Sequence, residues 1–178
     1  FRSPGADCRR KYTGRVFDEY GEVTVEVDHG DYDLAGDEDT TATTFVANTT
    51  NYIVSKPADV KKFAGVGTGG ALLTETATYY DGATSWDKAP SAGLPTREAR
   101  WLASPSSFVE TSKEYDSWGN LTAYVNALGA RTEFAFEPTY HLFPTSTTNA
   151  LGQTTTTTWD VVCGAPTGTT DLNGSRRR

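Results

Sequence analysis

The second half of the chain carries a degenerate repeat, and this repeat limits the folds that the chain can adopt. Residues 126–129 and 149–152 both read Asn-Ala-Leu-Gly and residues 171–174 read Asp-Leu-Asn-Gly, so glycines fall at 129, 152 and 174, spaced 23 and 22 residues apart. Pairs of an aromatic residue and an acid occur at 115–116, 136–137 and 159–160, spaced 21 and 23 residues apart. A period near twenty residues indicates a small structural unit stacked on copies of itself. Such an array chiefly builds extended surface, which points away from an enzyme.

Alternation of apolar and polar residues predicts β-strands along the chain. Val23, Val25 and Val27 share one face of the segment 22–28, while its acids share the other face, which is typical of a half-buried strand. Further strands are predicted over 40–54, 72–80, 121–125, 131–137 and 154–159, with another starting at 144. Turns or loops are predicted at 17–21, 30–39, 65–70 and 81–95, and one short helical turn at 57–63.

The pattern predicts an all-β fold of stacked antiparallel β-hairpins with little or no helix. Residues 1–178 are interpreted as one continuous β region, since no break in composition separates two domains. Within it, 1–109 is irregular with long insertions, 110–174 holds the regular repeats, and 175–178 is interpreted as a tail. The chain begins at Phe1 without a methionine, so we expect an excised or processed part of something longer.

Composition excludes some classes of partner. Lys plus Arg number 16 and Asp plus Glu number 23, giving a net charge of −7, which disfavours nucleic acid because phosphate binding needs clustered positive charge. No apolar run approaches the roughly 20 residues of a membrane span. Cys8 and Cys163 are too few for a disulfide framework, and two readings stay open: one bridge closing a long loop, or two independent thiols.

The repeat motifs resemble those of the RHS or YD-repeat proteins. The resemblance is carried by Tyr115-Asp116 with Gly119-Asn120, by 149–156 and by 164–167. In the first half, residues 17–24, 36–41 and 79–82 are similar to the repeat-bearing part of the B component of insecticidal Tc toxins. Together these motifs cover roughly residues 12 to 174.

The resemblance implies a sheet of β-hairpins that winds into a hollow shell. In toxins of this family the shell encloses a cytotoxic segment, and in related cell-surface proteins it serves adhesion and glycan contact. The family's self-cleaving shells carry an aspartyl autoprotease, and residues 171–174 are only superficially similar to its motif because Leu172 replaces the proline; we interpret them as a repeat turn.

The hypothesis that follows is a non-catalytic segment of shell from a secreted or cell-surface, toxin-complex-like protein. Its partners would be neighbouring repeats or toxin-complex subunits. The alternative, from another class, is an autonomous carbohydrate-binding or adhesion module.

One candidate metal site lies in the acidic loop. Asp31, Asp33, Asp37 and Asp39 could supply the several oxygen ligands that calcium prefers on a flexible loop. The spacing matches no complete EF-hand, because the glutamate expected at the end of such a loop is missing. The alternative is a solvated acidic loop that binds nothing.

One candidate glycan-binding residue is Trp86, in the irregular connection 81–95. Exposed aromatic residues on a sheet can stack on sugar rings, whereas the alternative for each tryptophan is core packing or hairpin bracing. Trp118 and Trp159 lie at repeat positions, which favours bracing. No arrangement of the two histidines, the serines or Cys163 indicates a catalytic site, and the Gly-rich segment 65–70 lacks the lysine of a phosphate-binding loop, so no catalytic residue and no cofactor other than calcium is predicted.

Overall fold

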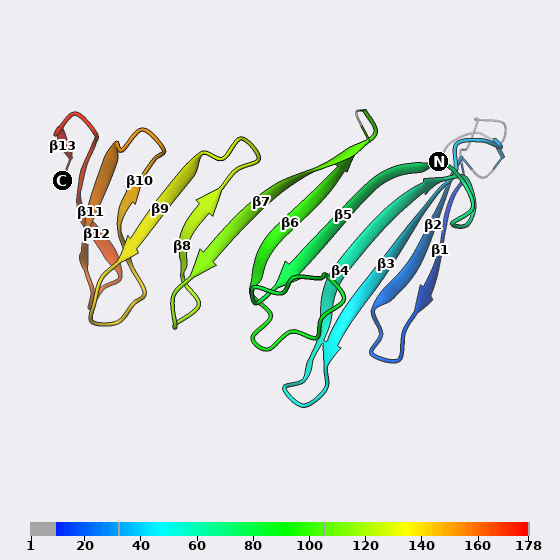
Figure 1. Cartoon of the computed structure of the whole chain (residues 1–178), viewed down its shortest axis with the longest axis horizontal. Coiled ribbons are helices and arrows are strands. Elements are labelled where there is room, and N and C mark those ends of the chain that lie inside the picture. The colour runs from blue at the N-terminus through cyan, green and yellow to red at the C-terminus, as the bar shows by residue number, and fades with distance from the viewer. Residues whose placement is uncertain (1–9, 32, 105, 178) are drawn as a thin grey trace, which may run out of the picture. The chain divides into compact units, whose positions relative to one another are not determined.

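The computed structural model describes residues 10–31, 33–104 and 106–177, and every helix or strand in this part of the chain is a β-strand (Figure 1). The strands are β1 (Lys11–Phe17), β2 (Val23–Asp31), β3 (Asp39–Asn48), β4 (Ile53–Ala64), β5 (Leu72–Tyr80), β6 (Pro95–Leu102), β7 (Ser107–Tyr115), β8 (Leu121–Val125), β9 (Arg131–Phe136), β10 (Pro144–Thr148), β11 (Thr154–Asp160), β12 (Ala165–Thr170) and β13 (Arg176–Arg177). They are hydrogen-bonded in sequence order, each beside the next. The predicted all-β fold of stacked antiparallel hairpins is confirmed.

The backbone contacts group into two compact units. Unit 1 comprises residues 1–93 and 99–109, and unit 2 comprises 94–98 and 110–178. The division near residue 110 coincides with the point where the sequence passes from long, irregular connections to short, regular turns.

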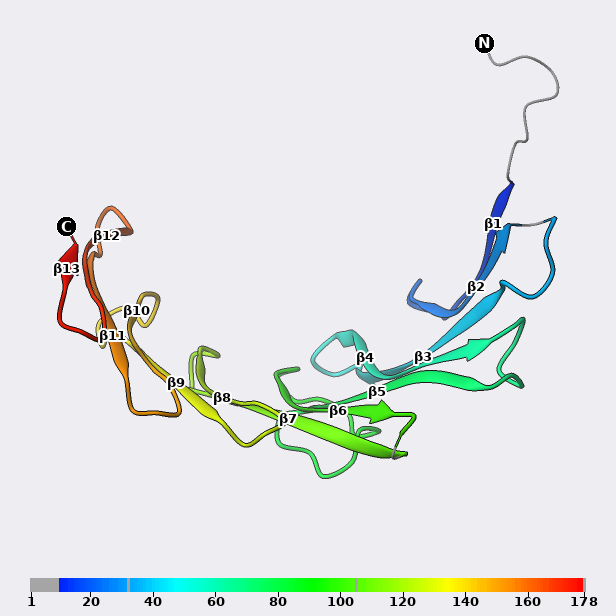
Figure 2. The ribbon, with the colours of Figure 1, turned by 90° about the horizontal axis from the view of Figure 1, so that it is seen from above.

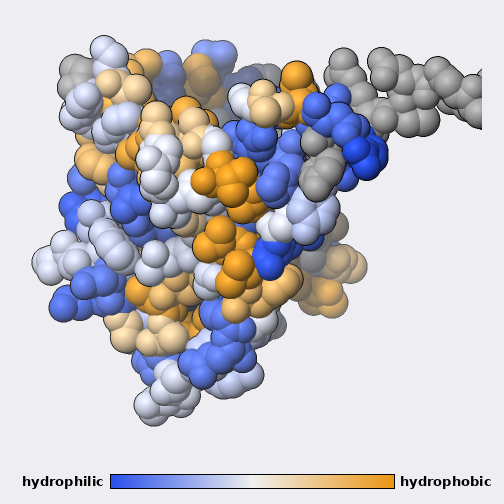
Figure 3. All heavy atoms as spheres, turned by 90° about the vertical axis from the view of Figure 1, so that its right-hand side faces the viewer, coloured by the Kyte–Doolittle hydropathy of each residue, from blue (hydrophilic) through white to orange (hydrophobic). Residues whose placement is uncertain are grey.

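In unit 1 the strands β1 to β5 lie in a single layer (Figure 2). A small cluster of buried side chains, Val46, Ala58 and Tyr80, forms its core, and Trp86 from the connection after β5 packs against it. All nine residues of β2 are half-buried, so the strand forms as predicted but burial does not alternate between its valine face and its acidic face. Viewed from the side of the molecule where β1 and β2 lie, apolar side chains remain open to solvent between polar ones (Figure 3).

Two predictions for unit 1 were wrong. The short helical turn predicted over 57–63 is instead the middle of β4, where Val60 pairs with Thr43 of β3 and with Thr76 of β5. Alanine and lysine favour helix there, but hydrogen bonding to a strand on each side outweighs that local preference. The single strand predicted over 40–54 is two strands joined by a turn, in which the Asn48 side chain accepts the N–H of Asn51 (3.1 Å).

Strand β1 and most of β6 and β7 were not predicted. Residues 11–17 mix lysine, arginine and glycine with apolar residues, so the strand shows no clean alternation. Its pairing with β2 forms it, with Gly14 opposite Val27 and Val16 opposite Val25. The pairing is irregular at both ends of β1, which further obscures a period of two.

Candidate functional site

Several turns of unit 2 share one hydrogen-bond pattern, built around the residue that opens the turn. In the turn after β8, the Asn126 Oδ1 accepts the N–H groups of Leu128 (2.9 Å) and Ala130 (3.0 Å). Gly129 has φ +79°, a conformation that glycine adopts without steric cost. The same two bonds are made at Asp116, Asn149 and Asp171. The repeated glycines of the sequence are therefore the αL positions of one turn motif.

The two periodic series in the sequence mark the two ends of the strands. Because neighbouring strands are antiparallel, successive turns alternate between these ends. Turns opening at Asp116, Glu137 and Asp160 lie at one end of the strands of unit 2, and each follows an aromatic residue. The turns with the repeated glycines lie at the other end. A repeat of about 22 residues is thus one hairpin.

Glu137 organises the longest turn of unit 2, between β9 and β10. The residue is 8% exposed, and its carboxylate accepts the N–H groups of Thr139 (2.7 Å), Tyr140 (2.9 Å) and Leu142 (3.1 Å). Burial alone raises the pKa of the carboxyl group, but the three N–H groups outweigh burial, and the pKa lies below its ordinary value. The turn is therefore held by a charged carboxylate.

Aromatic residues that precede the turn acids donate hydrogen bonds to proline carbonyls. In unit 1, the Tyr80 hydroxyl donates to the Pro57 carbonyl (2.9 Å). In unit 2, the Tyr115 hydroxyl donates to the Pro95 carbonyl (3.0 Å), and the Trp159 indole N–H donates to the Pro144 carbonyl (2.7 Å). The aromatic donors belong to the aromatic–acid pairs found in the sequence, but the proline carbonyls that accept from them were not predicted. Pro95 and Pro144 each open the strand before the aromatic residue, and this order is a signal that sequence reasoning missed.

Trp118 and His141 join two turns at one end of unit 2. Their rings stack with centroids 3.5 Å apart and planes inclined by 12°. The Asn120 side-chain amide donates to the His141 carbonyl (2.7 Å), which fixes the same pair of turns. Trp118 braces a hairpin, as its repeat position indicated, yet it remains 64% exposed.

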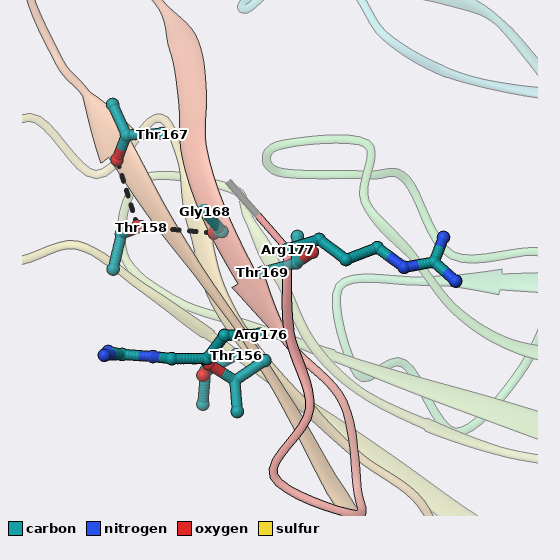
Figure 4. A pocket seen from close by; sticks show the side chains of 8 residues that line it. Thr156, Thr158, Thr167, Gly168, Thr169, Arg176 and Arg177 are labelled. Atoms are coloured by element: carbon teal, nitrogen blue, oxygen red, sulfur yellow. Dashed lines mark hydrogen bonds between the residues drawn. The ribbon is translucent and has the colours of Figure 1, made fainter.

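Two hollows lie over strands β8 to β13. One, of about 160 Å³, is lined mainly by threonines of β11 and β12 together with Arg176 and Arg177 (Figure 4). Figure 4 shows the Arg176 side chain beside Thr156, and Thr158 hydrogen-bonded to Thr167 and Gly168. The other, of about 320 Å³, is lined by Thr122, Arg131, Glu133, Phe134, Ala135, Ser146 and Thr148. Both hollows are bordered by hydroxyl and charged groups.

The four predicted calcium ligands already contact cationic side chains or backbone N–H groups. Asp33 forms an ion pair with Arg10, and Asp39 one with Lys62 (2.8 Å). The Asp37 carboxylate accepts the N–H of Asp31 (2.9 Å). Over residues 10–31, 33–104 and 106–177, no three histidine, cysteine, aspartate or glutamate side chains are grouped so as to hold a metal ion. The calcium site stays a prediction, and it would require these contacts to rearrange.

Calcium binding by these four acids predicts a higher melting temperature of the chain in calcium than in chelator, and an unchanged melting temperature would contradict the site. The measurement is a thermal melt followed by circular dichroism, in millimolar calcium and in chelator. A ligand that binds only the folded state raises the melting temperature. A melting temperature that rises in calcium for the wild-type chain but not for an Asp37→Asn variant would therefore establish the site.

Trp86 lies partly buried against the cluster of Val46, Ala58 and Tyr80. This contact fits core packing, the alternative role considered for Trp86. A role of Trp86 in glycan binding stays a prediction.

The Gly-rich segment 65–70 is a loop that Thr40 holds in place. The fully buried Thr40 hydroxyl donates to the Gly65 carbonyl (2.8 Å) and accepts the Gly67 N–H (2.7 Å). The thiol of Cys163 is exposed, and Cys8 lies outside the described residues, so a bridge between them stays untested. No helix in the described part of the chain is long and apolar enough to cross a membrane.

Comparison with known proteins gives matches among solved structures but none by sequence. No family model matches the chain, and no curated protein matches it. Among solved structures, it is weakly similar to the crystal structure of the Tc toxin components TcdB2-TccC3, described as TcdB2-TccC3-TEV, with a TM-score of 0.34 and 11% sequence identity. The match covers 93% of this chain and 10% of that chain, so the chain spans about a tenth of the length of the protein it matches.

Proposed function

We propose that this chain is a non-catalytic structural segment of a longer shell of stacked β-hairpins. It would form a stretch of wall that encloses or presents a cargo, in a secreted or cell-surface, toxin-complex-like parent protein. The observation that carries the proposal is the strand order, in which each strand is hydrogen-bonded to the next along the chain from β1 to β13. Such an array grows by adding hairpins, and each hairpin depends on its neighbours for stability.

The small core supports this proposal. The buried apolar residues in the described part of the chain are Val46, Ala58, Ala77, Tyr80, Ala99 and Ala123, and four of these six are alanines. A core of this size favours a segment that neighbouring repeats cover.

The outermost strand at the N-terminal end of the sheet supports it as well. Tyr12, Val16 and Phe17 of β1 are each more than half exposed. β1 is the first strand in the order of the sheet, and large apolar side chains exposed on an outermost strand are commonly covered by further structure. An additional hairpin packed beside β1 would cover these side chains.

The test is the mass of the purified chain, measured by size-exclusion chromatography with light scattering. We expect open-ended association that grows with protein concentration, because uncovered edges pair with one another. A concentration-independent monomer near 19.2 kDa would overturn the proposal and favour the autonomous adhesion module. A double variant, Val16→Lys with Phe17→Lys, is the matched control, because charge on the edge strand should reduce the association.

A further inference from the structure

Three turns at one end of the strands of unit 2 carry exposed apolar side chains. They are the turns 116–120, 137–143 and 160–164, which join β7 to β8, β9 to β10 and β11 to β12. Four large apolar residues of these turns are each more than half exposed. Apolar side chains gathered on one exposed surface commonly mark a site of interaction. We call this surface the turn face, defined by Trp118, Tyr140, Leu142 and Val162.

Ring contacts join the three turns to one another. Trp118 of the first turn stacks on His141 of the second. Phe143 of the second turn stacks on Trp159, which precedes the third turn, with ring centroids 5.1 Å apart. The Phe143 ring also lies beside Gly164, at the end of the third turn. The exposed side chains are therefore held on turns that contact one another, and little conformational entropy is left to lose when a partner binds.

The Trp118 indole has one face free. His141 covers the other face, yet Trp118 remains 64% exposed. The face of an indole ring attracts a guanidinium or ammonium group within about 6 Å of the ring centroid. Tyr140, in the neighbouring turn, is also more than half exposed and offers a second ring of this kind. Both rings favour a partner that carries arginine or lysine.

The charges of the three turns favour the same kind of partner. Each turn opens on an acid, at Asp116, Glu137 and Asp160, and none of the three contains lysine or arginine. Burial opposes ionisation of Asp116 and Glu137, but N–H groups that donate to the carboxylates outweigh it, and the pKa of all three acids lies below its ordinary value. In contrast, the two Asn-Ala-Leu-Gly turns at the other end of the strands carry no charged side chain. The negative charge is therefore local to the turn face.

We propose that the turn face binds a basic, apolar segment of a partner protein, with an arginine or lysine on the open face of Trp118 and aliphatic side chains against Leu142 and Val162. The carboxylates attract the cations of the segment, and contact removes the apolar side chains from water. Hairpins added beside the outermost strands, as the wall proposal requires, would leave these turns uncovered. The inference therefore does not rest on the wall proposal.

The test is surface plasmon resonance on the full chain, captured at low density through an N-terminal biotin so that captured molecules do not associate. The probe is a synthetic peptide of alternating leucine and arginine residues. Two matched peptides separate its components: glutamate replaces arginine in one, and serine replaces leucine in the other. We expect the leucine–arginine peptide to bind most tightly, and its affinity to fall as salt is added.

Variants of the chain locate the binding surface. Trp118→Ala should weaken binding roughly tenfold and Leu142→Ser roughly three- to fivefold, because buried aromatic and apolar contacts carry most of the energy of an interface. Leu128→Ser is the matched control and should have no effect, since Leu128 is 93% exposed at the other end of the strands. Asp116→Asn should weaken binding roughly two- to threefold and reduce its dependence on salt. Asn126 forms the same turn with a neutral amide, so this variant removes the charge and keeps the turn.

Each other outcome contradicts a named part of the proposal. Circular dichroism of each variant confirms that the sheet is retained. Absence of binding by the leucine–arginine peptide overturns the proposal as a whole, equal binding of the glutamate peptide overturns the basic class of partner, and equal binding of the serine peptide overturns the apolar contact. Equal weakening by Leu128→Ser and Leu142→Ser overturns the assignment to the turn face. If no peptide binds but Leu142→Ser reduces self-association of the chain, the occupant is a second copy of the chain and not a basic partner.

Discussion

Replacing Tyr80 with alanine is expected to lower the free energy of unfolding of unit 1 by about 3 kcal/mol or more. Tyr80 is 7% exposed and is the largest member of the core cluster with Val46 and Ala58. Truncation leaves a cavity in a single-layer sheet whose core is otherwise built of small residues. It also leaves the Pro57 carbonyl without the hydroxyl that donates to it. The measurement is urea unfolding followed by circular dichroism.

Two variants separate the causes of this effect. Tyr80→Phe keeps the ring and removes the hydroxyl, so it should cost only about 1 kcal/mol. Tyr52→Ala is the matched control, because Tyr52 is 79% exposed and should contribute little. Equal losses for Tyr80→Ala and Tyr52→Ala would show that the cluster does not hold unit 1 together.

The stacked-hairpin architecture was predictable because the sequence repeats with a period of about 22 residues. The glycines at 129 and 152 and the acids at 116, 137 and 160 reported the two ends of successive hairpins, and the turns confirm both series. Alternation identified β2, since its valines share one face of the strand and its acids the other.

The contacts that fix the sheet were harder to predict, because they join residues far apart in the sequence. The proline acceptors of Tyr80, Tyr115 and Trp159 lie 23, 20 and 15 residues before their donors. Because the separation between proline and aromatic residue is not constant, no sequence pattern predicts these hydrogen bonds. The two faces of β11 could not be told apart for a related reason: the run 154–158 reads as five equivalent threonines, and only the registers with β10 and β12 separate them. Local helix preference misled the interpretation of 57–63 because partner strands on both sides decide its structure.

Acid is expected to weaken unit 2 through the carboxylates that organise its turns. The pKa of Asp116 is lowered because the N–H groups of Asn120 and Trp118 outweigh the opposing effect of burial, and the N–H groups of Cys163 and Val162 lower the pKa of Asp160. Glu137 behaves in the same way. A carboxyl group whose pKa is lowered on folding stabilises the folded state above its unfolded pKa, near 4. That stabilisation is lost as the pH falls through the lowered value.

The urea midpoint of the wild-type chain should therefore fall steeply as the pH is lowered from about 5 to 2, since all three turns then lose their charged acceptor. Glu137→Gln should lower the melting temperature by several degrees at neutral pH, because one side-chain oxygen becomes an amino group facing N–H donors. It should also flatten the pH dependence, because Gln does not titrate. Glu133→Gln, at a side chain that is 57% exposed and accepts only from Arg131, is the control and should leave the slope unchanged. Asn126 and Asn149 hold their turns, at the other end of the strands, with neutral amides, so those two turns should not respond to acid in this way. Identical slopes for Glu137→Gln and the wild type would contradict the assignment of Glu137 as the charged acceptor of its turn.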